Sequence, residues 1–458
     1  MGLLNGNPVR LLRKGKLKVA VYGLGHVGAP VMAVWLRAGA HVIGVDKSDI
    51  VIRNVLKGRS HIKEPGVEET FSKAISQDRL EATTDLVYAS RESNFKIITV
   101  PVGFNNGVTD LFAVKEVAES IAKGLKDTDV VSLNATVPPG TTEEFLLPIL
   151  EKHCGLQCEK QFGLIYTPER IYEGRAIKDI EDNYPSIVAG IGPRSLRAGA
   201  ALYSFVAKKG VIKMSSIRVA EFTKICEGVY RDVNIALANE LAKVAEQLKV
   251  DCWEARAASN SQPFCNIHKP GIGVGGACIP VYPHFLIEVA NKFKQQCDIV
   301  KITRKINLSM PAYCIENAIK LMRIAGKDIS NSNVAILGLA FRSEVEDTRL
   351  SPTYDIINEL LALGCRIVVH DPYVKEDEKI PEQVKLTNDL SYTLTNADLV
   401  IVATDHKKYS KLTKKTIEKY VTDPVVVYDG RGILTESKFR GTFFGGIGRG
   451  YNANLRQS

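Results

Sequence analysis

The sequence predicts an α/β fold, with two doubly wound parallel-sheet domains joined by a helical middle region. Three observations carry this prediction. A strand, a glycine loop and a helix open the chain, helical periodicity fills the stretch from Ser215 onward, and alternating strands and helices return at Asn333. Short apolar strands that alternate with helices are typical of parallel sheets covered on both faces. The expected domains are residues 1–212, 213–328 and 329–458.

The first domain opens with a βαβ unit. An apolar strand is expected at residues 19–22, a helix at about 27–38, and a second strand at 41–45 that ends at Asp46. Further short apolar runs predict strands in "FKIITVPV", "DVVSLNATV", "QFGLIYTP" and "SIVAGI".

The middle region reads as helix. The stretch "SIRVAEFTKICEGVYRDVNIALANELAKVAEQLKV" has helical periodicity for about nine turns, and no strand candidate follows it until Asn333. A helix of this length is expected to form a dimer seam, and an intramolecular core is the alternative. After it, "NVAILGLAF", "SPTYDIINELLALG", "CRIVVHDP", "ADLVIVAT" and "PVVVYDGRGIL" predict the second Rossmann-like domain.

Composition excludes several classes of protein. The chain has 458 residues, 45% of them hydrophobic and 24% charged, which is typical of globular proteins with two or three domains. No apolar run is long enough to span a bilayer, so no membrane partner is expected. The net charge of +9 comes from scattered basic residues without a nucleic-acid-binding motif. A solvated surface is the expected reading, and attraction to anionic ligands such as nucleotides is the alternative.

The nine cysteines are an odd number and form no CxxC pair. This pattern argues against a zinc ribbon or a disulfide framework and indicates a reducing, cytoplasmic location. No metal site is expected. The basic N-terminal stretch is expected to be a flexible arm, and the tail after Phe444 is expected to be mobile.

The glycine loop "GLGHVG" fits the dinucleotide-binding pattern, because it follows a strand and opens a helix. Gly23 allows the tight turn, Gly25 lets the backbone reach a pyrophosphate, and Gly28 allows close packing of helix and strand. Asp46 is placed to accept from a ribose 2′-hydroxyl and would repel a 2′-phosphate, so the expected cofactor is NAD; Lys47 weakens this preference slightly. The expected cofactor-binding residues of this unit are Gly23, Gly25, His26, Val27, Gly28 and Asp46.

A second glycine-rich segment, "PGIGVGGACIPVYPHFL", surrounds Cys278. Either it is a turn that happens to contain a cysteine, or the backbone and the thiol must approach a ligand closely. In the second half, "GLAF" lacks the dinucleotide pattern, but that domain can still bind a nucleotide at its switch-point crevice.

Several segments together resemble the UDP-sugar 6-dehydrogenases, also called nucleotide sugar dehydrogenases. They are "GLGHVG", "IKEPGVEE", "NATVPPGTT", "YTPERIYEGRA", "AEFTKICEGVYRDVNIALANELA", "GIGVGGACIP", "GLAFRSEVEDTRLSP" and "VVYDGRGIL", and they run from about residue 18 to 433. The resemblance implies that two NAD⁺ oxidise the C6 alcohol of a UDP-sugar to a carboxylate.

The resemblance also implies roles for single residues. Cys278 matches the nucleophile, which captures the C6 aldehyde as a thiohemiacetal that is oxidised to a thioester. Lys224 matches the lysine that stabilises charge on the C6 oxygen. The other catalytic residues implied are Glu169, Glu173 and Thr136, with Thr136 also near the cofactor. The substrate-binding residues implied are Arg170, Lys224, Arg231, Asn266, His268, Gly271, Gly275, Phe341, Arg342, Arg349 and Arg431.

The alternative to these catalytic roles is structural. Lys224 would then lie on a solvated helix face, and Glu169 and Glu173 would be surface salt-bridge partners. A free thiol has a pKa of about 8.5, so Cys278 would need Lys224 or a helix beginning near Pro283 to ionise.

The motifs "VYRDVNIALANELA" and "NIHKPGIGVGG" look most like the branch that acts on UDP-N-acetylhexosamines in polysaccharide biosynthesis. UDP-N-acetylmannosamine is the first choice of substrate, UDP-N-acetylglucosamine the second and UDP-glucose the third. The chain departs from the family at five positions. Tyr282 replaces the usual aspartate, Gly228 the usual asparagine and Ala277 a frequent histidine, and Phe264 and Cys265 stand where an arginine is expected. A catalytically weak UDP-sugar-binding paralogue and a dehydrogenase that stops at the aldehyde are therefore the alternatives.

Overall fold

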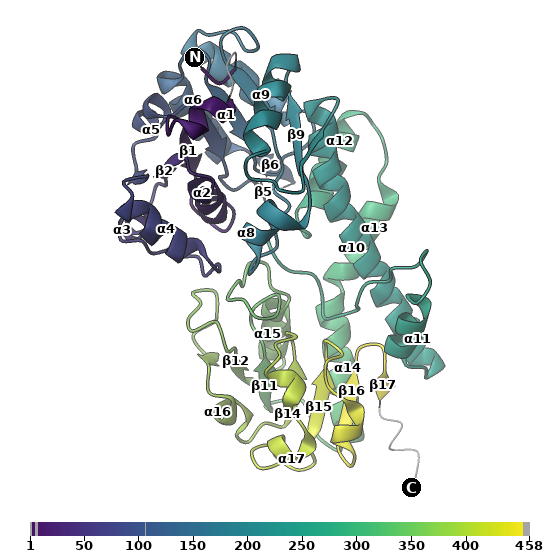
Figure 1. Ribbon diagram of the computed structural model, residues 1–458. Helices are drawn as coiled ribbons and strands as arrows, with labels where there is room; N and C mark the ends of the chain where they lie inside the picture. The colour runs from purple at the N-terminus through teal and green to yellow at the C-terminus, as the bar shows by residue number, and fades with distance from the viewer. Residues whose placement is uncertain (1, 5–7, 106, 452–458) are drawn as a thin grey trace. The chain divides into compact units, whose positions relative to one another are not determined.

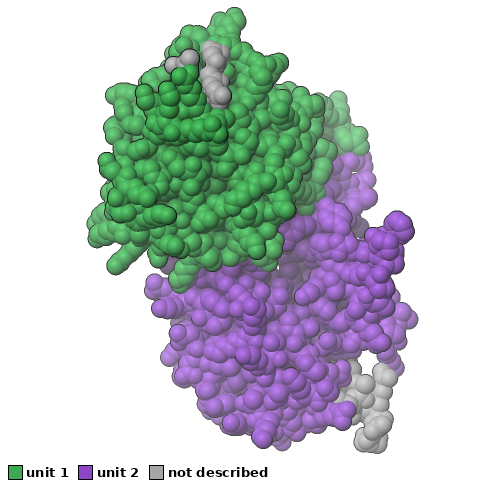
Figure 2. Space-filling view, viewed as in Figure 1, with its two compact units in different colours: residues 1–227, 284–295 green, residues 228–283, 296–458 purple. Residues whose placement is uncertain are grey.

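The computed structural model describes residues 2–4, 8–105 and 107–451. It divides into two compact units (Figure 2). The first contains residues 1–227 and 284–295, and the second contains residues 228–283 and 296–458. The division falls within two helices, α10 (Ile217–Leu248) and α12 (Tyr282–Lys292).

The first unit contains an eight-stranded sheet in the order β10-β9-β8-β7-β4-β1-β2-β3. Figure 1 labels β1, β2 and β9 among these strands. Its strands are β1 (Lys18–Tyr22), β2 (His41–Val45), β3 (Leu80–Thr83), β4 (Phe95–Ile98), β7 (Val130–Leu133), β8 (Gly163–Tyr166), β9 (Ser186–Gly190) and β10 (Val211–Lys213). A separate hairpin is formed by β5 (Gly103–Asn105) and β6 (Val108–Asp110).

Helices cover both faces of this sheet, because alternate residues of each strand point to opposite sides. One face packs on α2 (Gly28–Arg37), α3 (Asp49–Leu56), α4 (Val67–Ser76) and α9 (Pro193–Tyr203). The other packs on α5 (Leu86–Glu92), α6 (Phe112–Gly124), α7 (Leu147–Cys154) and the first turns of α10. The remaining turns of helix are α1 (Pro8–Arg13), α8 (Ala176–Lys178), Thr142–Leu146 and Asp179–Asn183.

The predicted parallel sheet is confirmed apart from one pairing. All neighbouring strands are parallel except β8 and β9, which are antiparallel. A parallel neighbour needs a crossover to the opposite end of the sheet. The chain after β8 instead forms the loop 167–175, and β9 returns beside it in the opposite direction.

The second unit contains a seven-stranded sheet in the order β13-β12-β11-β14-β15-β16-β17. Its strands are β11 (Asn333–Leu337), β12 (Arg366–His370), β13 (Lys385–Thr387), β14 (Leu399–Val402), β15 (Val426–Asp429), β16 (Phe443–Gly446) and β17 (Gly450–Tyr451). Only β17 is antiparallel to its neighbour among these strands.

One face of the second sheet packs on α11 (Cys252–Ser259), α14 (Met310–Ile324), α15 (Thr353–Ala362) and the last part of α10. The other packs on α16 (Leu390–Leu394), α17 (Lys414–Ile417) and the turns Tyr409–Lys411 and Glu436–Phe439. The helical middle region is confirmed: α10 to α14, with α13 at Asp298–Leu308, fill it, and the structure describes no strand between Lys213 and Asn333.

Both termini differ from the predictions. Part of the expected N-terminal arm is folded, because Leu3 and Leu4 are buried and α1 follows them. Part of the expected mobile tail forms β16 and β17, while residues 452–458 lie outside the described residues. All nine cysteines are free thiols. Among the described residues, no helix combines the length and the apolar character needed to cross a bilayer.

Candidate active site

The loop between β1 and α2 lies at the carboxyl end of the first sheet, where the strand order turns from β1 to β4. Gly23 has a φ of +89°, a conformation that favours glycine. A Cβ on Gly28 would lie 1.7 Å from the carbonyl oxygen of Gly23, so close packing of helix and strand requires glycine here. A Cβ on Gly25 would meet nothing within 4 Å. The backbone at Gly25 is therefore open to a ligand, as a pyrophosphate-binding loop requires.

Asp46, directly after β2, holds this loop. Its Oδ2 accepts a hydrogen bond from the Leu24 amide at 2.9 Å, and its Oδ1 accepts from the Ser48 amide at 3.0 Å. Val27, at the N-cap of α2, makes no side-chain capping hydrogen bond, so its side chain does not compete with a phosphate for the first amides of the helix. An open glycine, this helix start and a carboxylate at the end of β2 fit a dinucleotide.

Glu169 lies half-buried in the loop after β8. The Asn134 amide Nδ2 donates to its Oε1 at 2.7 Å. Burial raises the pKa of Glu169 to about 7, while the hydrogen bond from Asn134 and the positive charge of Lys224 lower it. A carboxyl group with this pKa can accept and release a proton near neutral pH. The structure thus places two predicted catalytic residues, Glu169 and Lys224, close enough to interact.

Asn134, which sequence reasoning missed, is held by a buried network. Its Nδ2 also donates to the Tyr203 hydroxyl at 2.8 Å, and the Ser132 hydroxyl donates to its Oδ1 at 2.6 Å. The Tyr203 ring in turn packs edge-on against Trp35 at a centroid distance of 5.8 Å. The core of the first unit therefore sets the orientation of the amide that contacts Glu169.

Four other predicted residues lie in the same unit. Glu173 Oε1 is 3.2 Å from Nδ1 of His26, so a predicted catalytic residue and a predicted cofactor-binding residue meet. Arg170 pairs with Glu227 of α10, with 2.8 Å between Nε and Oε1. Thr136 is partly exposed in the loop after β7.

Two buried glutamates position these loops, and sequence reasoning gave neither a role. Glu64 accepts hydrogen bonds from the amides of Gly174 and Ala176, each at 2.7 Å, and so holds the loop that carries Glu173. Glu64 lies in the segment "IKEPGVEE", but nothing in its local pattern separates a buried carboxylate from an exposed one.

Glu221 anchors the start of α10. It accepts from the amides of Gly140 and Thr142 at 2.6 Å and 2.9 Å and from the Thr142 hydroxyl at 2.6 Å. Burial raises the pKa of Glu221 to about 7, although these hydrogen bonds lower it. The available signal was its position among the apolar residues Ile217, Ala220 and Ile225 on one helix face.

In the second unit, the glycines before Cys278 pack on the segment 341–352. A Cβ on Gly275 would lie 2.5 Å from Cβ of Phe341, and one on Gly276 would lie 2.8 Å from the Phe341 ring. The Gly276 amide donates to the Arg349 carbonyl at 2.7 Å. Packing within the protein therefore requires these two glycines, in addition to any close approach of a ligand. Cys278 itself is exposed.

Buried polar residues of "YRDVNIALANELA" tie α10 to the same glycine-rich segment. Asn239 accepts from the Gly271 amide at 2.9 Å and donates to Asn307 at 3.0 Å. Asp232 accepts from Arg304 at 2.6 Å and from Asn307 at 2.8 Å. The motif that predicts a preference for N-acetylated sugars thus also has a structural role.

Further predicted substrate-binding residues surround this segment. A Cβ on Gly271 would lie 3.1 Å from Nη1 of Arg431, whose Nη2 donates to Asp405 at 3.3 Å. His268 is half-buried, and burial together with the positive charge of Arg231 lowers its pKa.

The last group lies on the segment after β11 or is exposed. The Arg349 guanidinium pairs with Asp347, with 2.8 Å from Nε to Oδ1. The Arg342 guanidinium carbon lies 5.8 Å from the centroid of the Phe341 ring. Asn266 is exposed.

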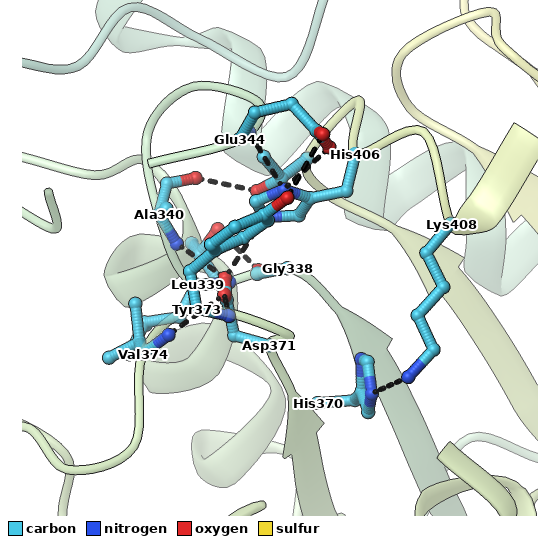
Figure 3. A network of polar contacts seen from close by, with 12 residues as sticks. Gly338, Leu339, Ala340, Glu344, His370, Asp371, Tyr373, Val374, His406 and Lys408 are labelled. Carbon is cyan, nitrogen blue, oxygen red and sulfur yellow. Dashed lines mark hydrogen bonds and ion pairs between the residues drawn. The ribbon is translucent and has the colours of Figure 1, made fainter. Parts of the chain in front are cut away.

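The second sheet has its own loop at the end of β11, and Figure 3 shows how Asp371 holds it. Asp371 Oδ2 accepts from the amides of Leu339 and Ala340 at 2.8 Å and 3.0 Å, and its Oδ1 accepts from Tyr373 at 2.8 Å. His406 Nε2 lies 3.2 Å from Oδ2. Burial opposes the charge, but these hydrogen bonds hold the pKa of Asp371 below its usual range. Asp371 follows β12 as Asp46 follows β2, so each sheet has an aspartate that holds the loop after its first strand.

The chain matches the UDP-glucose/GDP-mannose dehydrogenase family in three segments. The NAD binding domain matches residues 17–206, the central domain residues 218–309 and the UDP binding domain residues 335–436.

Individual relatives span nearly the whole chain. A UDP-N-acetyl-D-mannosamine dehydrogenase of Pyrococcus horikoshii is 33% identical over 435 residues, which is 95% of this chain and 100% of the relative. The structure of a UDP-D-ManNAc dehydrogenase from the same organism has a TM-score of 0.87 at 32% identity and covers 95% and 100% of the two chains. An NDP-N-acetyl-D-galactosaminuronic acid dehydrogenase from Methanosarcina mazei Go1 has a TM-score of 0.83 at 30% identity and covers 100% of both chains. A UDP-glucose dehydrogenase from Pyrobaculum islandicum has a TM-score of 0.84 at 26% identity, with 94% and 98% covered.

Proposed function

Because the chain belongs to the UDP-glucose/GDP-mannose dehydrogenase family and is an NAD-dependent UDP-sugar dehydrogenase, we propose that its substrate is a UDP-N-acetylhexosamine. UDP-N-acetylmannosamine is the first choice, and the C6 hydroxyl is oxidised to a carboxylate. The observation that carries the proposed oxidation chemistry is the half-buried Glu169, whose pKa burial raises to about 7 although the charge of Lys224 lowers it. In such a pair, the carboxyl group can transfer a proton and the lysine can stabilise negative charge on an oxygen.

The NAD⁺ supplies the chemistry of accepting a hydride in each of the two oxidations. The residues proposed to hold it are Gly23, Gly25, His26, Val27, Gly28, Asp46 and Thr136. Gly25 leaves room for the pyrophosphate, and Asp46 would accept from the ribose hydroxyl.

Cys278 is proposed to attack the C6 aldehyde after the first oxidation and to form a thiohemiacetal. The second oxidation converts it to a thioester, so that the reactive aldehyde does not escape. Lys224 stabilises the charge on the C6 oxygen, and Glu169 takes a proton from the water that hydrolyses the thioester. Glu173 and Thr136 are proposed to assist at the same centre.

The nucleotide and sugar are proposed to contact ten further residues besides Lys224, which we also expect to bind the substrate. These are Arg170, Arg231, Asn266, His268, Gly271, Gly275, Phe341, Arg342, Arg349 and Arg431. The arginines suit the phosphates, since a guanidinium donates to phosphate oxygens in a fixed planar arrangement. We propose that the chain is divided into domains at residues 1–212, 213–328 and 329–458, with the cofactor in the first and UDP in the third.

The choice of an N-acetylated sugar rests on the motifs "YRDVNIALANE" and "NIHKPG", and relatives named for N-acetylhexosamine substrates at 30–33% identity support it. UDP-N-acetylglucosamine and UDP-glucose are the alternatives. Tyr282 and Gly228 favour a second candidate, a paralogue that binds UDP-sugar with little turnover.

A homodimer, or a larger oligomer, is proposed to form along α10. Apolar side chains are exposed there at helical spacing: Tyr230 at 52%, Leu237 at 47%, Leu241 at 40%, Val244 at 55% and Leu248 at 67%. A continuous apolar stripe of this length is typical of a face that another helix covers.

The test is NADH release across a panel of UDP-sugars, combined with the mass of the product. We expect two NADH per UDP-N-acetylmannosamine and a uronate product. Cys278→Ser should still bind the UDP-sugar but lose the second oxidation or stall at a slowly hydrolysed ester.

Three outcomes would overturn parts of the proposal. Faster turnover of UDP-glucose than of both N-acetylated sugars would refute the substrate choice. Two NADH per sugar from Cys278→Ala would refute the covalent mechanism. Calorimetric binding of UDP-sugars without any NADH would favour the binding paralogue.

A further inference from the structure

Within the second unit, the Tyr282 side chain fills the space that a side chain at position 228 would need. A Cβ on Gly228 would lie 2.6 Å from Cδ2, 3.1 Å from Cβ and 3.3 Å from Cγ of Tyr282. The three atoms nearest to that Cβ all belong to this tyrosine, and Gly228 is buried. Contacts under 3.0 Å are essentially absent for real Cβ atoms, so a side chain at position 228 would displace the Tyr282 side chain.

Gly228 is also the single glycine of the 32-residue helix α10. Glycine in a helix interior is unfavourable relative to alanine, because the unfolded chain loses more conformational freedom when it folds. Because a glycine at position 228 leaves space for the Tyr282 side chain, this packing explains why a poor helix former occurs within α10.

Tyr282 is linked to Cys278 by a turn of the backbone. The Tyr282 amide donates to the Cys278 carbonyl at 3.0 Å, and the Val281 amide donates to the same oxygen at 3.1 Å. On the other side of the thiol, the Gly276 amide is held by the Arg349 carbonyl at 2.7 Å. The turn 278–282 therefore has one end at the exposed thiol and the other at the side chain seated on Gly228.

We propose that Tyr282 is a positioning residue for Cys278 and that Gly228 and Tyr282 are mutually dependent, since the tyrosine fixes the turn only when position 228 is glycine. The proposal rests on the proposed function for the significance of Cys278, but the packing and its effect on the thiol can be measured without turnover. It gives the two departures from the family pattern one common physical cause.

The test is a double-mutant cycle of Gly228→Ala and Tyr282→Ala, with Tyr282→Phe as the matched control that keeps the ring. Thermal unfolding reports the packing. The alkylation rate of Cys278 by iodoacetamide, followed by peptide mass spectrometry with Cys154 of the first unit as internal reference, reports the position of the thiol.

Gly228→Ala should lower Tm in the wild-type background and raise it by about 2–4 °C in the Tyr282→Ala background, where helix propensity alone acts. Both single alanine variants should change the alkylation rate of Cys278 by about threefold or more. Adding Gly228→Ala to Tyr282→Ala should change that rate no further. In the Tyr282→Phe background, Gly228→Ala should still lower Tm, because the ring atoms that meet the added Cβ are retained.

A rise in Tm for Gly228→Ala in the wild-type background would overturn the dependence of the pair. If Gly228→Ala changes Tm as expected in both backgrounds but the alkylation rate of Cys278 stays the same in all variants, the positioning role of Tyr282 would be overturned. Failure of the proposed function is distinguishable from both, because it appears as absence of NADH from a wild-type protein whose Tm and alkylation behave as expected.

Discussion

Among single residues, Asn134 influences the protonation of Glu169 directly, because it donates a hydrogen bond to the Glu169 carboxylate. Its donated hydrogen bond favours the ionised carboxylate, so Asn134→Ala should raise the pKa of Glu169 further above about 7. A hydrogen bond to a charged group corresponds to about one pKa unit. If Glu169 acts as a base, the acidic limb of the kcat profile should move to higher pH by about one unit in this variant.

The control is Ser132→Ala, which removes a bond to the other end of the Asn134 amide and leaves the contact with Glu169 in place. Its acidic limb should stay within a few tenths of a unit of wild type. An unshifted limb in Asn134→Ala, with a normal Tm, would exclude Glu169 as the titrating group.

Local spacing was enough to predict some site residues and not others. Gly23, Gly28 and Asp46 were predictable, because the strand, turn and helix that need them are contiguous in sequence. The contact of Asn134 with Glu169 joins residues 35 apart and exists only once β7 and β8 are paired. No periodicity reports such a contact. The packing of Tyr282 against Gly228 could not be predicted. In the sequence, these two residues are only unexplained departures from the family pattern.

At the scale of elements, Glu221 decides how α10 is attached to the turn at residues 140–142. Its pKa in the folded protein is raised to about 7, so between about pH 4 and 7 the folded state binds more protons than the unfolded state. The free energy of unfolding should therefore fall as pH rises through this window, by up to about 3 kcal/mol from this group.

Glu221→Gln should remove that contribution and make the pH dependence shallower. Urea unfolding at several pH values measures it. Glu221→Ala should in addition leave buried amides without an acceptor and cost about 1–3 kcal/mol at every pH. An unchanged slope in Glu221→Gln would show that the group is not protonated in the folded state at these pH values.

The elements themselves were predicted well where their pattern is strong. The strand at 41–45 and the long helix α10 appear at the expected positions, because alternation and helical periodicity are local signals. The hairpin β5–β6 was missed, since each of its strands has three residues. The direction of β9 was missed because it depends on the path of the loop 167–175.

For the whole molecule, the exposed stripe on α10 predicts self-association. Leu241→Glu combined with Val244→Glu would place charges in a buried apolar seam and should convert a dimer to a monomer at micromolar concentration. Sedimentation velocity measures this directly. Glu240→Gln, on an exposed part of the same helix, is the control and should remain dimeric. A wild-type protein that sediments as a fully active monomer would refute the dimer.

The overall architecture was predictable because it is repeated: two sheets of alternating strands and helices flank a region without strands. The boundaries of the compact units were not, because they cut through α10 and α12. Helical periodicity continues across such a division and carries no mark of it.

Asp371 has a consequence for how natural variants of this chain are interpreted. An acidic residue after the second strand of a doubly wound domain is commonly taken to choose the coenzyme, and Asp46 fits that view. At Asp46, one amide donates to each oxygen, which leaves acceptor capacity for a ribose hydroxyl. At Asp371, the amides of Leu339, Ala340, Tyr373 and Val374 and the His406 ring together occupy both oxygens. An inherited change at position 371 would accordingly appear as reduced protein abundance and not as altered coenzyme preference. The two equivalent aspartates should therefore be placed in different phenotype classes.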